Sequence, residues 1–301
     1  MAKRTTRKAR AKGKKAKASK AAVVAMSAGD RRTLAEACDR LEHPSLAARL
    51  TALIGRPVEE GLKLLPRRWY VRIHDATEAT IARSLALAIR TLPGSALSSR
   101  EDLHKILGIS SGAVGGFFGL PGTLAELPVS TTLIMRSIAD IARDEGEDLA
   151  TVEGRLACVE VFAYGGRPTD DDAAETGYYG LRIALSFHFS LVSQQLVQQG
   201  IVSRTLPATV ALTRAIAARF GIAVSDKLAF QLVPVAGALG GAMVNAIFMQ
   251  HFQDMARGHF TVRRLERKYS PSLVRETYEN IRRNETVVRR DRPRVLGGLE
   301  A

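Results

Sequence analysis

Ser110 lies at the centre of the first sequence pattern that could do chemistry. The stretch GISSG at residues 108–112 fits the G-x-S-x-G pattern of serine hydrolases. In such enzymes a strand precedes the serine and a helix follows it, so that a strained turn exposes the hydroxyl. Residues 101–107 instead have the pattern of a helix. We therefore interpret the stretch as a turn between helices, with a serine hydrolase or peptidase as an alternative.

A second group of residues could bind a metal ion. His251 and Asp254 share a face of a predicted helix, and His259 lies about two turns beyond His251. A carboxylate such as Asp140 could complete the ligand set. However, the pattern H-E-x-x-H is absent, and arginines adjoin these residues. We predict a polar helix face here, with metal binding as the alternative.

The sequence predicts no cofactor. It contains no P-loop, no dinucleotide-binding glycine pattern and no paired C-x-x-C. Its only two cysteines, Cys38 and Cys158, exclude a disulfide scaffold and a four-cysteine zinc site, and they fit a reducing cytoplasm.

Small residues mark two segments that resemble each other. GAVGG at 112–116 matches GALGG at 237–241, and DIAR at 140–143 matches DMAR at 254–257. Two related units, 106–146 and 228–260, would explain the match, as would coincidence in sequence rich in glycine and alanine. Glycines four residues apart let helices approach closely, and an amide inside an apolar run needs a hydrogen-bond partner. The residues assigned to helix packing are Gly112, Gly116, Gly119, Gly237, Gly241 and Asn245.

Positive charge is concentrated at the two ends of the chain. The formal net charge is +14, of which residues 1–20 carry +10 and residues 256–301 carry +6. The 235 residues between them are close to neutral, at −2. We expect a disordered basic tail over residues 1–28 and a basic tail over 286–301. The cations predicted to bind an anionic surface are Lys3, Arg4, Arg7, Lys8, Arg10, Lys12, Lys14, Lys15, Lys17 and Lys20.

Residues 29–285 should fold as one all-α domain. Apolar residues recur at helical spacing, strand-like alternation is scarce, and about ten helices are expected in a globular bundle. Pro128 should open a helix that ends at Gly146, and Asp148 should cap the next helix. Gly221 should end a helix over 207–219, and the final helix should run from Pro271 to about Asn284.

Two stretches without any charge, residues 106–125 and 228–253, are each long enough to span a membrane. Their glycines, prolines and amides favour two central helices, rich in small residues, inside a soluble bundle. In-plane insertion, a re-entrant hairpin and a true span remain alternatives. The apolar segment after the basic N-terminus has only six residues, too few for a secretory signal, so we expect a cytoplasmic protein.

Two blocks, residues 111–148 and 234–269, resemble the EcsC family of bacterial proteins. The resemblance covers roughly residues 45–285. It implies a mostly helical protein in the cytoplasm or at its membrane, related to one encoded beside the subunits of an ABC transporter. It implies no settled reaction and no catalytic residue.

These observations favour a non-enzymatic helical protein at the cytoplasmic face of the membrane. An anionic membrane surface or a membrane complex, such as a transporter, would be its partner. Nucleic-acid binding through the basic N-terminal tail is the first alternative, because phosphate contact requires only positive charge. No small-molecule ligand can be named.

Overall fold

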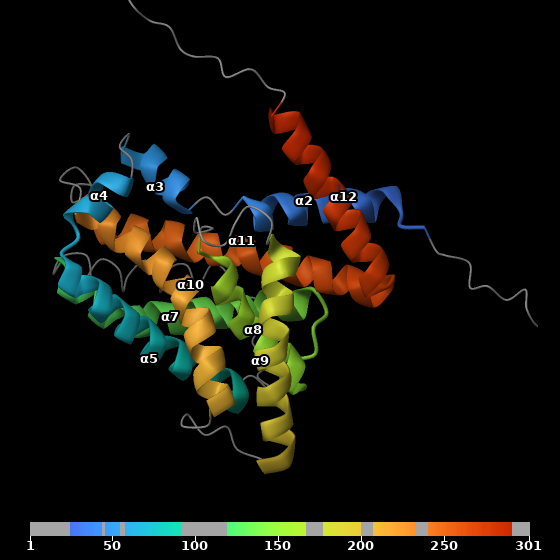
Figure 1. Ribbon diagram of the computed structural model, residues 1–301, viewed down its shortest axis with the longest axis horizontal. Helices are drawn as coiled ribbons and strands as arrows, with labels where there is room; N and C mark the ends of the chain where they lie inside the picture. The colour runs from blue at the N-terminus through green and yellow to red at the C-terminus, as the bar shows by residue number, and fades with distance from the viewer. Residues whose placement is uncertain are drawn as a thin grey trace, which may run out of the picture.

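The computed structural model describes residues 25–43, 46–54, 58–91, 119–166, 177–199, 207–232 and 240–290. Every regular element in these ranges is an α-helix, which confirms the predicted all-α fold (Figure 1). In chain order the ten helices of these ranges are α2 (Ala28–Glu42), α3 (Leu46–Ile54), α4 (Val58–Leu64), α5 (Arg67–Thr91), α7 (Gly119–Asp144), α8 (Val152–Tyr164), α9 (Tyr178–Gln199), α10 (Pro207–Leu232), α11 (Gly240–Lys268) and α12 (Pro271–Arg290).

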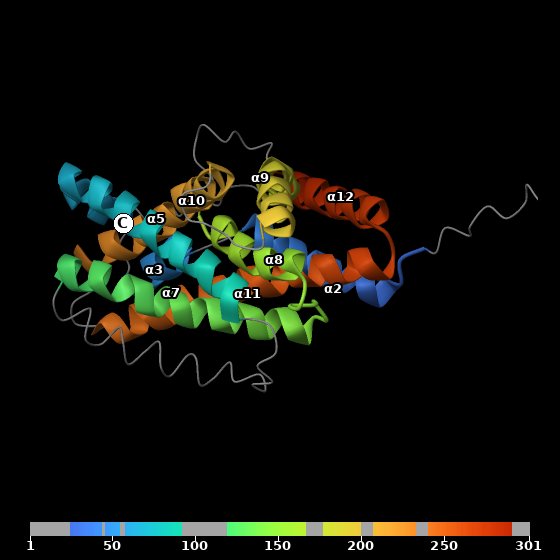
Figure 2. The same ribbon diagram turned by 90° about the horizontal axis from the view of Figure 1, so that it is seen from below.

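Helices α7 and α11 lie side by side along the long axis of the molecule (Figures 1 and 2). Contacts between them ascend along both helices, from Glu126 with Asn245 to Ser137 with Gln253. The two helices are therefore parallel. Each carries the same ion pair three residues apart, Asp140 with Arg143 in α7 and Asp254 with Arg257 in α11.

Helix α10 packs on α4, α5, α8 and α9, and an aromatic cluster anchors it in the core. The ring centroids of Phe162 and Phe220 lie 5.1 Å apart, and those of Phe220 and Phe252 lie 5.5 Å apart. Phe248 adjoins Phe252 at 5.1 Å. Such edge-on pairs add about 0.5–1.5 kcal/mol each beyond their burial. The cluster therefore ties α8, α10 and α11 into one core.

Two predicted helix boundaries are wrong, because tertiary packing overrides local preferences. Pro128 does not open a helix but lies inside α7, which begins at Gly119. Thr123 and Leu127, which precede it, are buried in the core. Gly221 likewise lies within α10, where buried Phe220 and Ala223 flank it. An interior glycine costs only about 1 kcal/mol, which this packing offsets.

Helix ends also differ from the prediction in detail. Thr151, not Asp148, caps α8, because its hydroxyl accepts a hydrogen bond from the amide of Gly154 at 3.1 Å. Helix α12 continues to Arg290, so the predicted C-terminal tail begins within a helix. The segment expected as a helix up to Leu107, and residues 1–24 of the predicted N-terminal tail, lie outside the described residues.

Two close contacts between helices depend on glycines that were not among those predicted from the sequence to pack helices. A Cβ atom on Gly61 of α4 would lie 2.0 Å from the carbonyl oxygen of Ala229 in α10. A Cβ atom on Gly258 of α11 would lie 2.8 Å from Cγ of Leu41 in α2. The first contact fixes α4 against the end of α10, and the second fixes α2 against α11.

Candidate functional site

The inner ends of the two charge-free stretches meet at one end of the bundle. Lys227 of α10 is fully buried and donates to Oε2 of Glu126 in α7 at 3.3 Å. Asn245 of α11 is 4% exposed and donates to Oε1 of the same carboxylate at 2.9 Å. Burial lowers the pKa of Lys227, while the charge of Glu126 opposes this effect. This buried polar triad joins three helices.

Helix α10 is the one helix in the described part of the chain whose length and hydropathy would allow it to cross a membrane. Half of the most apolar 18-residue segment of α10 is buried inside the protein. The core helix of a soluble protein passes the same test, so this property alone assigns no location.

Several residues named from the sequence lie outside the described residues, namely Ser110, Gly112, Gly116 and Gly237. Gly119 is the first residue of α7, and Gly241 is the second residue of α11. The ten tail cations from Lys3 to Lys20 are also outside the described part.

Three of the four residues considered for metal binding have separate partners. His251 is buried, and its Nε2 lies 2.8 Å from the carbonyl oxygen of Gly165. Burial lowers the pKa of His251 to about 4. Asp254 pairs with Arg49 at 2.6 Å and with Arg257 at 3.1 Å, and Asp140 pairs with Arg143 as described above.

His259 occupies a different buried cluster between α8, α9 and α11. Its Nδ1 lies 2.9 Å from the hydroxyl of Tyr178. Its Nε2 has no hydrogen-bond partner and lies 3.8 Å from Oε2 of Glu160. Tyr164 donates to the other oxygen of Glu160 at 2.5 Å. The structure therefore does not bring His251, Asp254, His259 and Asp140 together, and the described residues contain no group of three or more metal-ligating side chains.

Burial favours the neutral forms of both Glu160 and His259. It raises the pKa of Glu160, against the lowering effect of Arg182. Burial, and then the charges of Arg182 and Arg263, lower the pKa of His259 well below its ordinary value. A carboxyl that retains its proton can donate a hydrogen bond or transfer that proton to a bound molecule.

Glu160 also lines a groove of about 490 Å³ between α8, α9 and α11. Arg182 separates this groove from a second one of about 650 Å³ between α9, α11 and α12. The guanidinium of Arg182 donates to Glu266 at 2.8 Å. The grooves have the size of small-molecule sites, and Glu160, a buried carboxyl with a raised pKa, lines the first of them.

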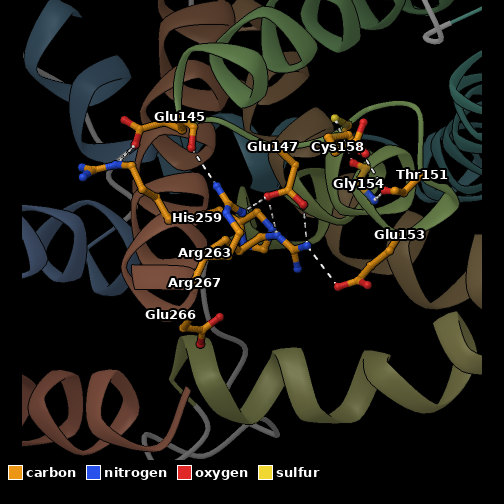
Figure 3. Close-up of polar contacts among 12 residues, drawn as sticks. Glu145, Glu147, Thr151, Glu153, Gly154, Cys158, His259, Arg263, Glu266 and Arg267 are labelled. Carbon is orange, nitrogen blue, oxygen red and sulfur yellow. Dashed lines mark hydrogen bonds and ion pairs between the residues drawn. The ribbon is translucent and has the colours of Figure 1, made fainter. Parts of the chain in front are cut away.

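Beside these grooves, a junction of acids and arginines joins the turn after α7 to the last turns of α11 (Figure 3). Gly146 adopts a φ of 72°, which ends α7 and directs its neighbours Glu145 and Glu147 toward α11. Arg263 binds Glu147 through two hydrogen bonds, of 3.0 and 2.6 Å, and Arg267 also binds Glu147.

Glu145 completes this acid–arginine junction. Its carboxylate accepts a hydrogen bond from Arg264 at 2.6 Å, and its carbonyl oxygen accepts one from Arg267 at 2.7 Å. Glu145 and Glu147, just after the end of α7, are thus ion-paired partners of α11.

The profile of the EcsC protein family matches residues 32–265. The chain belongs to the EcsC family. This confirms the resemblance seen in the two blocks, and the matched region runs from α2 through most of α11. Neither the curated proteins nor the solved structures contain a match to this chain.

The EcsC match covers the buried triad, the His259 cluster and all but Arg267 of the acid–arginine junction. Sequence reasoning missed Glu126 and Lys227, although a signal was present. Glu126 directly follows the first charge-free stretch, and Lys227 directly precedes the second. From these positions alone, an ion pair between Glu126 and Lys227 could have been predicted. No comparable signal links Glu160 to His259, because 99 residues separate them and no spacing rule joins α8 to α11.

Proposed function

We propose that this EcsC protein works without an enzymatic step at the cytoplasmic face of the membrane, as a partner of the lipid surface or of a membrane complex such as a transporter. The observation that carries the proposal is the meeting of the two charge-free stretches at one end of the bundle. Thr123 in the first stretch donates to Gln231 in the second at 2.6 Å. The described ends of the two stretches, residues 119–125 and 228–232, thus lie in contact.

Exposed side chains at the same end support this assignment. Met243, in the first turn of α11, is 43% exposed. The starts of α5, α7 and α11 lie toward the same end of the molecule in both views (Figures 1 and 2). An apolar end together with a basic N-terminal sequence suits a protein held at an interface by two weak signals rather than by a span.

The N-terminal cations supply the second signal in this proposal. Each Lys or Arg near an anionic bilayer contributes about 1 kcal/mol, and this attraction fades with salt. Three or four simultaneous contacts would change partitioning by about 100-fold or more.

Deletion of residues 1–20 tests the proposal in a sedimentation assay with vesicles. We expect the full chain to bind vesicles that contain phosphatidylglycerol more tightly than vesicles of phosphatidylcholine alone. The shortened chain should bind the anionic vesicles about 100-fold more weakly but still measurably, with unchanged circular dichroism.

Competition with short duplex DNA separates the lipid interpretation from the nucleic-acid alternative. DNA at equal charge should leave a substantial fraction of the full chain on anionic vesicles at moderate salt. Complete removal by DNA, together with no lipid binding by the shortened chain, would favour nucleic acid and overturn the proposal.

A further inference from the structure

The join between α4 and α5 presents a basic and apolar surface to solvent. We name it the elbow surface. Its apolar members are Leu64, Tyr70 and Val71, which are 60%, 46% and 63% exposed. Its cationic members, all exposed, are Lys63, Arg67, Arg68 and Arg72.

Buried neighbours hold the elbow surface in a fixed shape. Leu65, Trp69 and Ile73 alternate with its members and are 5%, 7% and 3% exposed. The amide of Trp69 donates to the carbonyl of Pro66 at 2.8 Å, which closes the first turn of α5. The contact of Gly61 with the backbone of Ala229 fixes α4 on α10. The exposed side chains are therefore carried on a rigid support.

The four cations of the elbow surface face solvent. None of them forms an ion pair with a carboxylate whose side chain the structure describes, and the acids that precede Lys63 most closely are Glu59 and Glu60 of α4. Asp75 is the nearest acid along α5, and it is also exposed. Arg72 lies over the ring of Trp69, 5.1 Å from its centroid, so this guanidinium stays beside the apolar members.

We propose that the elbow surface is where this protein docks on an anionic phospholipid bilayer, with its cations on the phosphates and Leu64, Tyr70 and Val71 in the interfacial layer. This inference rests on the proposed function and assigns it a contact surface. Charge complementarity identifies the occupant, because cations interleaved with exposed aromatic and aliphatic side chains match a surface that is anionic outside and apolar beneath. Nucleic acid would satisfy the arginines but would leave Leu64 and Val71 in water.

The position of the elbow agrees with this occupant. Helix α4 packs on the last part of α10, and Tyr70 donates to the carbonyl of Leu62 at 3.4 Å. The start of α5 thus lies at the end of the bundle where the charge-free stretches meet (Figure 2). A bilayer that contacts this end meets the cations and the exposed apolar side chains together.

Trp69 makes the inference directly measurable. It is the only tryptophan in the chain and lies at the elbow, so its fluorescence reports on this surface alone. The experiment uses the full chain and vesicles of phosphatidylcholine with phosphatidylglycerol whose acyl chains carry bromine, which quenches nearby tryptophan. Sedimentation measures whether the protein is bound, and quenching measures whether the elbow is the part that docks.

The matched variants are R67E with R68E at the elbow and R31E with R32E at the start of α2. Both pairs are exposed arginines, and each double variant changes the net charge by the same amount. Glutamate in the first turn of α5 favours the helix dipole, so folding should be retained, as circular dichroism will check. We expect the elbow variant to bind about 100-fold more weakly and to lose quenching, while the α2 variant keeps both.

A second pair of variants tests the apolar members of the elbow surface. Tyr70→Ser with Val71→Ser should weaken binding about tenfold or more. Ile183→Ser with Phe187→Ser, at similarly exposed positions of α9, should leave binding unchanged.

Each outcome decides a different claim. If the full chain does not sediment with anionic vesicles, the proposed function fails and the docking surface fails with it. If the full chain binds but the two arginine variants weaken binding equally, the elbow assignment is wrong while the proposed function stands.

Discussion

The elbow surface and the acid–arginine junction place similar sequences in opposite environments. RRWYVR at residues 67–72 and RRLERK at residues 263–268 each begin with two arginines and contain further cations. At the elbow the arginines are exposed and have no ion-pair partner in the described residues. At the junction Arg263 and Arg264 are held by Glu147 and Glu145. The same residue type is therefore a structural element in one place and an unneutralised charge in the other.

The difference depends on which residues face the arginines. Gly146 turns the chain after α7 so that two carboxylates meet α11, whereas no acid whose side chain is described forms an ion pair with the arginines at the start of α5. Surface cations without a partner contribute little to folding, while a partly buried bidentate pair fixes two elements together. Net charge alone thus does not identify a binding surface. Cations that form ion pairs must be distinguished from cations that do not.

The largest effect should come from removing a carboxylate at the junction. Glu147→Ala leaves Arg263 partly buried without its bidentate partner, which should lower the free energy of unfolding by about 3 kcal/mol. Urea denaturation measures the change. Glu153→Ala is the matched control, because Glu153 also binds Arg263 but its side chain is 81% exposed, and it should cost under about 1 kcal/mol. Equal losses in both variants would contradict the distinction.

The junction should also weaken in acid. Burial raises the pKa of Glu147, but Arg263 and Arg267 together lower it below its ordinary value of 4.5. The unfolded state therefore takes up a proton first as the pH falls, and the stabilisation present above pH 4.5 is lost through the lowered pKa. The acid-induced loss should be smaller in the Glu147→Ala variant.

Substitution of Gly61, which holds α4 of the elbow surface against α10, should destabilise the protein nearly as much as Glu147→Ala. Gly61→Ala forces a Cβ atom into the carbonyl of Ala229 and should lower the free energy of unfolding by about 2 kcal/mol. Gly221→Ala in the adjoining helix places its Cβ 3.6 Å from Thr77, an ordinary contact, and should be neutral or stabilising by up to about 1 kcal/mol. Thermal unfolding compares the two. A stable Gly61→Ala variant would show that α4 can shift on α10.

The protonation of His251 should make the free energy of unfolding depend on pH. Burial lowers its pKa from 6.5 to about 4, so the unfolded state binds more protons between these values. The free energy of unfolding should therefore fall as the pH drops through this window, by about 2 kcal/mol between pH 6.5 and 5. Urea denaturation of the wild type and of His251→Gln measures the slope. An unchanged slope in the variant would exclude His251 as its source.

The smallest effect should come from the elbow arginines themselves. R67E with R68E should change the free energy of unfolding by no more than about 0.5 kcal/mol, because these side chains are solvated and unpaired. Guanidinium denaturation, which also screens charge, is the measurement. A loss of several kcal/mol would mean that the elbow, like the junction, is structural.

Helical spacing and capping residues were sufficient to predict the all-α fold and many helix ends. Glu42, Leu64 and Tyr164 each end a helix where a proline or glycine follows within two residues, which is a local stop signal. Pro128 and Gly221 misled the prediction, since each is a strong local signal that burial of its neighbours overrides.

Less of the candidate site than of the fold could be predicted from the sequence. His259 was named, but as a metal ligand beside His251, although the two side chains have different partners. The elbow surface was not singled out, because exposure on a helix depends on what packs against the other face. The packing of α5 on α7, α8 and α10 determines that Trp69 and Ile73 point inward while Tyr70 and Val71 point to solvent.

The buried triad limits how deeply a bilayer could receive this protein. For α10 to exchange its protein neighbours for lipid, Lys227 would have to leave Glu126 and enter hydrocarbon together with Asp226, which is also buried. Transfer of such residues costs up to roughly 3 kcal/mol each on insertion scales, and Glu126 would be left in the core without its ammonium partner. Asn245 would keep its hydrogen bond to a carboxylate that had lost its countercharge. In the proposed docking, the triad would therefore keep α10 in the bundle and confine lipid contact to the side chains that the bundle already exposes.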